Sequence, residues 1–302
     1  MSVFGRATFS AAGYAVARPS YPASLFKTVL SYHNARSPTG TLLDLGCGHG
    51  LISRELSPHF AKVYATDPSA NMVKQTAEST KDPKIIVRQS SAEDLSWLPD
   101  NSVDMVVAGQ SAHWFDYARV WPELSRVVKP GGSMAFWGYK DNVFVGHKKA
   151  TEILDRFCYA EGDVVPGVEG MYNYWEPGRY IVRNLLRQIE PPPPAWQDVK
   201  RILYDAPPDL AVLPDEETAW LRKRMNLGGL EGYLRTFSSL QAWKDAHPEA
   251  KSRAEGGDGD LADIFMDTII EAEPEWKAMG ERWRDAELDV VWGTYILMAR
   301  RT

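Results

Sequence analysis

Three glycines alternate with other residues in the segment 44–50, whose sequence is DLGCGHG. Glycines at a strand-to-helix turn let backbone amides and the start of the next helix lie against a ligand. The spacing is G-x-G-x-G, and Leu51 stands where a dinucleotide fingerprint has its third glycine. Asp44 precedes the first glycine, and its carboxylate suits a cationic ligand better than a pyrophosphate. The segment therefore predicts a small-molecule site that differs from the usual dinucleotide site.

A second acid lies at the position where nucleotide-binding folds hold a ribose. Asp67 comes 21 residues after Gly46, at the end of the expected strand 62–66. An acid at this place can accept hydrogen bonds from both ribose hydroxyls. The turn and the acid together predict a nucleoside-containing ligand.

A histidine, His113, follows the expected strand 102–108. It should lie at the carboxyl edge of the sheet, where ligands bind in open α/β folds. Its imidazole could act as a general base or could donate a hydrogen bond to a substrate. The alternative is a histidine whose hydrogen bonds are made by its neighbours in the pocket wall.

The elements that must position these residues alternate between strand and helix in the first half. Strands are expected at 41–44, 62–66, 85–88, 102–108 and 133–139. A helix over 119–128 should be stopped by Lys129–Gly132 (KPGG). This alternation predicts βαβ units and a doubly wound, Rossmann-like parallel sheet.

The second half has a different pattern. Helices are expected at 146–160, 177–189, 215–227, 230–246 and 261–279, and strands at 198–204 and 289–300. The two strands could pair and complete the sheet. We therefore expect an amino-terminal arm or lid (1–35), a core (36–145), a helical cap with one late core strand (146–288) and a last core strand (289–302).

Composition excludes several classes of protein. The chain has 302 residues, a net charge of −6 and two cysteines, too few for a disulfide framework. It lacks an apolar run of about 18 residues, and its start has no signal-like apolar region. The net charge argues mildly against nonspecific binding of nucleic acid. We expect a cytoplasmic protein that binds neither nucleic acid nor membrane.

The sequence resembles the class I S-adenosylmethionine (SAM) methyltransferases. The resemblance rests on DLGCGHG, on Asp67, on SAEDL at 91–95 and on KPGG at 129–132. The chain is also similar to the trans-aconitate methyltransferase group, through YAVARPSYP at 14–22, GQSAHWFD at 109–116, WEPGRY at 175–180 and LRTFSS at 234–239. The resemblance implies a seven-stranded methyltransferase sheet with a helical insertion or cap before the last strand.

The resemblance also implies a set of cofactor contacts. The glycine turn would face the methionine part of SAM, Asp67 the ribose, and the residues after the third strand the adenine. Many relatives carry an acid where Ser91 stands, so Glu93 is an alternative partner for the adenine amine. The complete set is Tyr14, Arg18, Asp44, Gly46, Cys47, Gly48, Gly50, Asp67, Pro68, Met72, Ser91, Ala92, Glu93 and Gln110.

The acceptor should meet aromatic walls and cationic anchors. Aromatic rings exclude water and can face a sulfonium, and arginine matches a carboxylate. The expected substrate residues are Tyr21, Trp114, Trp137, Tyr139, Trp175, Arg179 and Arg235, and no metal is expected. Each ring could instead belong to the core, and each arginine to the surface.

These expectations favour methyl transfer to a small, acidic organic acceptor, with methyl ester formation on a carboxylate. A carboxylate of pKa about 4 is already ionised at neutral pH and needs no base. One alternative is a phenolic O-, N- or C-methyltransferase of secondary metabolism, which would gain from His113 as a base. Others are a non-catalytic methyltransferase-like regulator and, least favoured, a nicotinamide dehydrogenase.

Overall fold

The computed structural model describes residues 20–34 and 40–302. Within them the chain forms two compact units. The first, called the sheet unit here, consists of residues 21–140, 180–204 and 294–302. The second, called the helical unit, contains residues 141–179 and 205–293. Each unit has its own packed interior, so each is described by itself.

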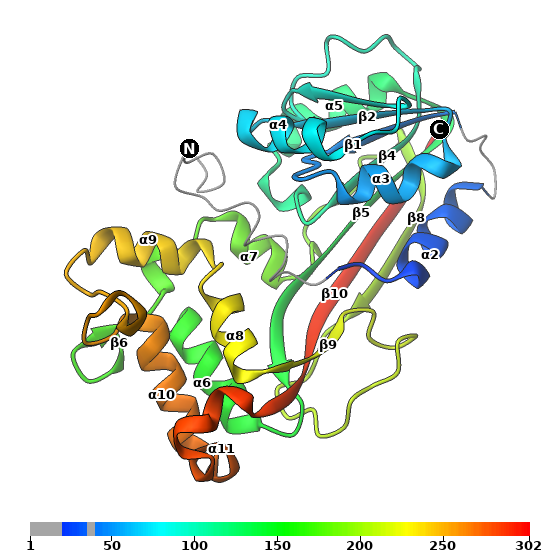
Figure 1. Cartoon of the computed structure of the whole chain (residues 1–302). Coiled ribbons are helices and arrows are strands. Elements are labelled where there is room, and N and C mark those ends of the chain that lie inside the picture. Colours follow the sequence, from blue (N-terminus) through cyan, green and yellow to red (C-terminus); the bar gives the residue numbers. More distant parts are fainter. Residues whose placement is uncertain (1–19, 35–39) are drawn as a thin grey trace. The chain divides into compact units, whose positions relative to one another are not determined.

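The sheet unit is built on a mostly parallel sheet (Figure 1). Along the sheet the strand order is β3-β2-β1-β4-β5-β10-β8. The strands are β1 (Thr41–Leu45), β2 (Lys62–Asp67), β3 (Ile85–Gln89), β4 (Val103–Gly109), β5 (Val128–Phe144), β8 (Trp196–Tyr204) and β10 (Glu287–Arg301). The pairs from β3 to β5 are parallel, and β8 runs antiparallel to β10. The expected doubly wound α/β sheet is confirmed.

Helices flank this sheet. They are α2 (Ala23–Asn34), α3 (Leu51–Leu56), α4 (Ala70–Ser79), α5 (Tyr117–Val127) and α7 (Gly178–Arg183), which begins in the helical unit. Leu43 and Phe136 pack in one buried cluster with Leu124 of α5. Trp137, the next residue of β5, instead meets Phe26 of α2 edge to face at 6.2 Å. Because successive strand residues point to opposite faces, these contacts show that α5 and α2 cover opposite faces.

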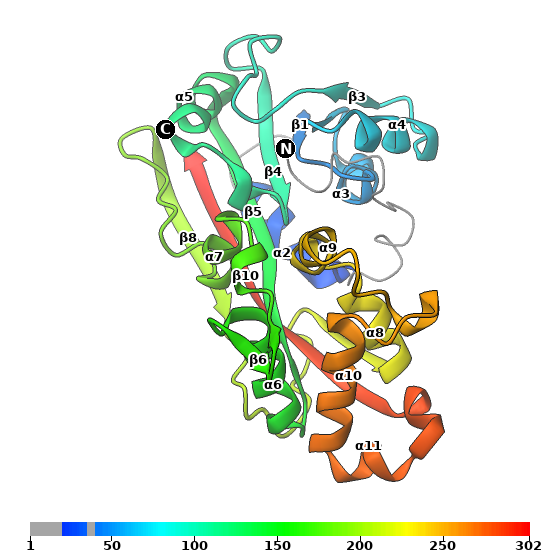
Figure 2. The same ribbon diagram turned by 90° about the vertical axis from the view of Figure 1, so that its left-hand side faces the viewer.

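The helical unit contains most of the second half of the chain. Its elements are α6 (Lys148–Tyr159), β6 (Asp163–Val165), β7 (Val168–Glu169), β9 (Arg222–Asn226), α8 (Leu227–Leu234), α9 (Ser238–Ala246), α10 (Leu261–Ala272) and α11 (Pro274–Ala278). Phe157 and Phe265 join α6 to α10, edge to face at 5.3 Å. Helices α6 and α10 lie side by side (Figure 2). Residues 141–144 of β5 and 287–293 of β10 also belong to this unit, where β9 pairs antiparallel with the start of β10.

Several expected helices are wrong in part. Segment 215–227 was expected to be helical, but it contains β9, which is fixed by pairing with residues 287–291 far along the chain. The expected helix 177–189 ends at Arg183, because Leu185 and Leu186 have φ of 55° and 51°. The expected helix 261–279 breaks at Glu273, ahead of Pro274, as the residue before a proline disfavours helical geometry.

Two other boundaries also differ from expectation. The expected helix 230–246 is two helices, α8 and α9, separated at residues 235–237. The segment KPGG (129–132) lies inside β5 instead of before it. There the pairing with β4 shifts register between Val103 and Met105, so the four residues form an irregularity in the strand.

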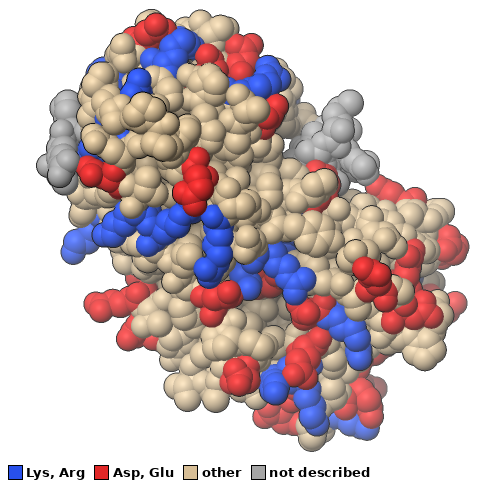
Figure 3. Space-filling view, turned by 180° about the vertical axis from the view of Figure 1, so that it is seen from behind, with Lys and Arg blue, Asp and Glu red and all other residues tan. Residues whose placement is uncertain are grey.

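No helix in the described part of the chain is long and apolar enough to cross a membrane. Over the face seen in Figure 3, basic side chains occur next to acidic ones. This surface agrees with the small net charge of −6.

Candidate functional site

Asp44, in β1, places a buried carboxyl group beside the glycine turn. It is fully buried, and the Ser53 hydroxyl of α3 donates a hydrogen bond to Oδ2 at 2.5 Å. The other oxygen, Oδ1, has no hydrogen-bond partner among the described residues. Burial raises the pKa of Asp44 to about 7, although the Ser53 hydrogen bond opposes the rise. This carboxyl can accept a donor from a ligand, and a cationic donor would favour its ionised form.

The three glycines of the turn have different surroundings. All have positive φ: +67° at Gly46, +57° at Gly48 and +79° at Gly50. A Cβ at Gly46 would lie 2.5 Å from Cβ of Ser111, and one at Gly50 would lie 2.6 Å from Cγ2 of Thr76. A Cβ at Gly48 would meet nothing within 4 Å. Two glycines therefore allow close packing of the protein, whereas Gly48 borders open space where a ligand can approach.

Asp67, at the end of β2, organises the same turn. Its Oδ2 accepts the Gly48 N–H at 3.0 Å, and its Oδ1 accepts the Ser69 N–H at 2.8 Å. Burial raises the pKa of Asp67, and these two amides oppose the rise. Ser69 also caps α4 by accepting the Met72 N–H at 3.4 Å. The acid thus holds the turn, and its carboxylate can accept further hydrogen bonds.

Three smaller contributors complete this side of the site. The Cys47 backbone N–H donates to the Thr66 carbonyl at 2.9 Å, and burial raises the pKa of its thiol. Cys47 is therefore a protonated packing residue and not a nucleophile. The Pro68 carbonyl accepts a hydrogen bond from Gln89 Nε2 at 3.0 Å, and Met72 is buried.

The loop after β3 is tied to the start of α5. Glu93 Oε1 accepts the Asp116 N–H at 3.0 Å, so this acid already has a structural contact. The Ser91 carbonyl accepts the Asp94 N–H at 3.4 Å, and Ala92 is buried in the core cluster.

Gln110, directly after β4, is held in the left-handed region at φ of 55°. Its Nε2 donates to the Tyr139 carbonyl at 2.9 Å, and its Oε1 accepts the Tyr139 N–H at 2.7 Å. Its backbone N–H donates to the Trp137 carbonyl at 2.8 Å. Gln110 therefore fixes the end of β4 to β5, and the strained backbone is maintained by three hydrogen bonds.

The predicted acceptor residues of the sheet unit are mostly aromatic. His113 is buried, Trp114 is 37% exposed, and their ring centroids lie 4.6 Å apart. Trp137 of β5 pairs with Gly109 at the end of β4. The Tyr21 ring packs edge to face on the Trp137 ring, with centroids 5.9 Å apart. The Trp137 indole N–H is buried and has no hydrogen-bond partner among the described residues. It is a donor that a ligand can satisfy.

The comparisons with known proteins agree with this geometry. A family model described as a methyltransferase domain matches residues 43–136. A probable SAM-dependent methyltransferase of Saccharomyces cerevisiae, CRG1, is 27% identical over 274 residues, which are 87% of this chain and 88% of the yeast protein. A methyltransferase of Claviceps purpurea is 25% identical over 313 residues, covering 95% of this chain and 90% of its own.

A solved structure assigned as a type II methyltransferase, from Anaeromyxobacter dehalogenans, shares the fold over nearly the whole chain. Its TM-score is 0.63 at 26% identity, with 94% of this chain and 97% of that chain covered. The protein is a class I SAM-dependent methyltransferase. The methyltransferase domain of the family model coincides with the strands that carry the glycine turn, Asp67 and Gln110.

The turn of this methyltransferase fits SAM in two respects. The unpartnered Oδ1 of Asp44 can accept the cationic amine of the methionine part. The open space at Gly48 admits a ligand against the backbone. The residues of the sheet unit that could hold the cofactor are Asp44, Gly46, Cys47, Gly48, Gly50, Asp67, Pro68, Met72, Ser91, Ala92, Glu93 and Gln110. Tyr14 and Arg18 lie outside the described residues.

Three predicted substrate residues belong to the helical unit of the methyltransferase. Trp175 donates its indole N–H to the Cys158 carbonyl at 2.7 Å. The Arg179 guanidinium stacks over the Trp175 ring at 4.6 Å, pairs with Asp141 and donates to the Tyr159 hydroxyl at 2.7 Å. Sequence reasoning missed Asp141 and Tyr159, because no local motif marks them as partners of an arginine.

The third residue, Arg235, is surrounded by acids. It pairs with Asp260 at 2.7 Å, with Asp263 at 3.0 Å and with Glu231 at 3.0 Å. Lys244 also pairs with Asp260 at 3.5 Å, and Arg284 pairs with Glu231 at 3.1 Å. These acids already bind the Arg235 guanidinium within the protein, and its substrate role stays a prediction.

Proposed function

We propose that the methyltransferase acts on a small organic acid and forms a methyl ester at a carboxylate oxygen. The supporting observation is the buried indole N–H of Trp137, which has no hydrogen-bond partner among the described residues. A buried N–H without a partner costs about 1–3 kcal/mol, and an acceptor oxygen would remove that cost. Because a carboxylate is ionised at neutral pH, the acceptor needs orientation and no base.

SAM, when bound, would supply a methyl carbon activated by the positively charged sulfur. The acceptor oxygen would bond to that carbon as the carbon–sulfur bond breaks, and the sulfur would leave as a neutral thioether. No proton is transferred, so the protein contributes proximity and alignment. Gln110 holds Tyr139 and Trp137 in place for this task through its three hydrogen bonds.

We further propose that the acceptor is a di- or tricarboxylic acid, as the resemblance to the trans-aconitate methyltransferase group suggests. We also propose Arg179 as a substrate residue, because its guanidinium pairs with a single acid among the described residues. Trp175 would hold the guanidinium plane by stacking. Tyr21 and Trp114 are proposed to line the acceptor pocket.

The proposed roles of the turn follow from its contacts. Asp44 would accept the amine of SAM, and Asp67 the ribose hydroxyls. Ser91, Ala92 and Glu93 would meet the adenine. Equilibrium binding of SAM to Asp67→Ala should fall steeply, since both the ribose acceptor and the partner of the Gly48 amide are lost. Unchanged affinity would refute this assignment.

A transfer assay with labelled SAM tests the acceptor class. Di- and tricarboxylic acids, phenols and amines are compared with the wild-type protein and with Trp137→Phe. We expect methyl esters from acids, and a higher KM for the acid in Trp137→Phe because the indole donor is lost. Transfer to phenols or amines alone would overturn the proposal.

His113 supports a second candidate function, phenol O-methylation, because its buried imidazole follows β4 and could take a phenolic proton. His113→Ala separates the two. Methyl ester formation should continue in this variant. A complete loss with a steep dependence on alkaline pH would favour the phenol. Tight SAM binding with no transfer to any acceptor would instead favour a non-catalytic regulator.

A further inference from the structure

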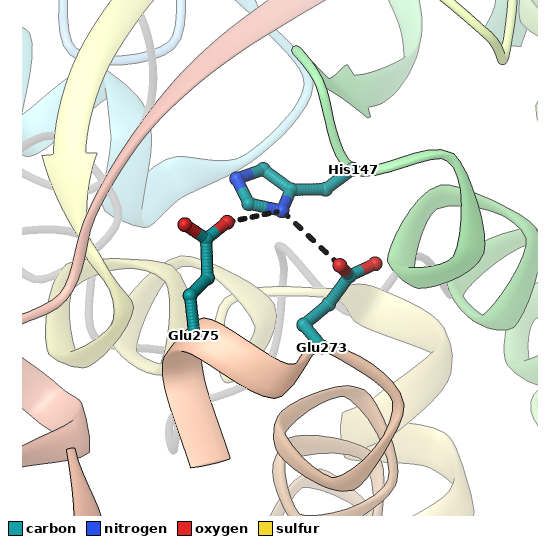
Figure 4. Close-up of side chains that lie close together, drawn as sticks. All are labelled: His147, Glu273 and Glu275. Atoms are coloured by element: carbon teal, nitrogen blue, oxygen red, sulfur yellow. Dashed lines mark hydrogen bonds and ion pairs between the residues drawn. The ribbon is translucent and has the colours of Figure 1, made fainter. Parts of the chain in front are cut away.

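We propose that His147, Glu273 and Glu275 form a binding site for a divalent transition-metal cation, with Zn²⁺ as the best match. His147 is the residue that precedes α6, Glu273 joins α10 to α11, and Glu275 lies in the first turn of α11. All three belong to the helical unit. Figure 4 shows the imidazole between the two carboxylates.

The distances favour a shared ion over a direct hydrogen bond. Nδ1 of His147 lies 3.4 Å from Glu273 Oε2 and 3.4 Å from Glu275 Oε1. A good N–H···O hydrogen bond measures about 2.7–3.2 Å, so both contacts are long. Two ligands at about 2.1 Å from a tetrahedral zinc lie about 3.4 Å apart, which is the observed spacing. All three ligand atoms lie within 4.8 Å of one another.

Contacts outside the cluster already orient two of the ligands. The His147 ring packs on Trp276, with centroids 4.3 Å apart and planes tilted by 33°. Glu273 Oε1 accepts the Ala150 N–H at 3.2 Å, which leaves Oε2 turned toward the imidazole. Partners of this kind are typical around metal ligands, because they fix the ring and carboxylate orientations.

Charge and access also suit a divalent cation. One neutral imidazole and two carboxylates carry a charge of −2, which balances the ion. The His147 and Glu273 side chains are mostly buried, whereas Glu275 is 70% exposed. The exposed side lets an ion enter and lets water complete the coordination. A mixed nitrogen and oxygen donor set of this size selects zinc-type ions over Mg²⁺ or Ca²⁺, which prefer oxygen.

The consequence of the site would be structural. His147 and Glu273 are separated by 126 residues, and they lie at the ends of α6 and α10, which pack through Phe157 and Phe265. A shared ion would join these helix ends and stabilise the helical unit. This inference does not depend on the identity of the methyl acceptor.

The test uses chelator-treated full-length protein titrated with ZnCl₂ and followed by calorimetry. We expect one saturable equivalent and a rise in Tm with zinc concentration. Glu275→Gln keeps the shape of this exposed side chain, and it should weaken zinc binding at least tenfold. The matched control is Glu281→Gln, an exposed glutamate of the same unit outside the cluster, which should bind as the wild type does.

X-ray absorption of the zinc-loaded protein gives an independent measurement. We expect one imidazole nitrogen and otherwise oxygen neighbours at about 2.0–2.2 Å. A lack of saturable binding, equal affinity in Glu275→Gln and wild type, or a shell without imidazole would overturn the proposal. Those results would leave His147 and the glutamates as an ion pair.

Discussion

The turn after β1 and the junction of α8 with α10 both bury two acids, but they provide very different partners. Asp260 accepts the Arg235 guanidinium at 2.7 Å and the Ala262 and Asp263 amides at 3.0 and 3.1 Å. Oδ2 of Asp44 accepts the Ser53 hydroxyl, and Oδ1 has no hydrogen-bond partner among the described residues.

The pKa shifts of the two regions follow this difference. Burial raises the pKa of Asp44 to about 7. Burial also acts to raise the pKa of Asp263, but the Asp260 and Arg253 amides and the Arg235 charge outweigh it and lower the pKa. An acid that is satisfied within the protein stabilises the fold. An acid with an oxygen that lacks a partner can accept a hydrogen bond from a ligand.

The largest expected effect comes from filling the open space of the turn. Gly48→Arg should reduce SAM affinity at least a thousandfold, about 4 kcal/mol, because the side chain would occupy the space at Gly48. Equilibrium dialysis with labelled SAM measures this. Gly162→Arg is the control, since Gly162 also has positive φ (+78°) and open surroundings but lies in the helical unit. Equal SAM binding by the two variants would contradict the turn as the cofactor site.

The next largest effect should appear at the junction of α8 with α10, where the acids have partners within the protein. It should appear only as a loss of stability. Arg235→Met removes the one guanidinium that pairs with all three acids, and we expect a loss of about 3 kcal/mol in the free energy of unfolding. Urea denaturation gives this value, and SAM affinity should not change. Intact stability with a raised KM for the acceptor would assign Arg235 to the substrate instead.

Gln110→Leu should cost about 2 kcal/mol of stability, since two side-chain hydrogen bonds to Tyr139 are lost. Turnover should fall as well, because the end of β4 loses two of its three hydrogen bonds to β5. Thermal unfolding and steady-state kinetics measure the two effects. Gln110→Glu keeps the acceptor for the Tyr139 N–H and should retain more of both. A wild-type kcat in Gln110→Leu would show that Gln110 does not position the acceptor side.

The smallest effect is a change of pH dependence in Asp44→Asn. The folded-state pKa of Asp44 is raised from 3.8 to about 7, so its protonated form stabilises the protein below pH 4. That stabilisation is lost as the pH rises through 7. Asn removes this dependence, so the stability of the ligand-free variant should change less between pH 5 and pH 8 than that of the wild type, and the variant should be the more stable of the two at pH 8. Its SAM affinity should be about tenfold lower, because the charge is gone.

Urea denaturation at pH 5 and pH 8, with and without SAM, measures both parts. A wild type whose stability does not change over this interval would contradict the raised pKa. A stabilised variant with unchanged SAM affinity would remove Asp44 from the cofactor site.

The parts of the fold that were predictable are those encoded locally. The glycine turn and Asp67 could be predicted from their spacing in the sequence. The three glycines are needed at the turn because each adopts positive φ there. The strands near 200 and 292 were expected from their β-branched and aromatic residues, and β8 and β10 confirm them.

Features that depend on distant partners could not be predicted. Segment 222–226 is a strand only because residues 287–291 lie beside it. Arg235 looked like a substrate anchor in its motif, and the acids around it at 260 and 263 give no local signal. The hydrogen bond that the Gln110 side-chain amide donates likewise depends on Tyr139, which lies in another strand. Helical periodicity predicted that Leu185 and Leu186 lie in a helix. Both are buried, but they lie in a turn with positive φ.

The position of β10 has a consequence for how the protein is made. This strand is synthesised after β5 and β8, yet it lies between them in the order of the sheet. A ribosome adds about 5–20 residues per second, and the emerging sheet lacks this inner strand until residues 287–301 have been made. Synthesis must therefore pass β10 before β8 can find its antiparallel partner. Every nascent chain passes through an interval in which the exposed edge of β5 requires protection from aggregation.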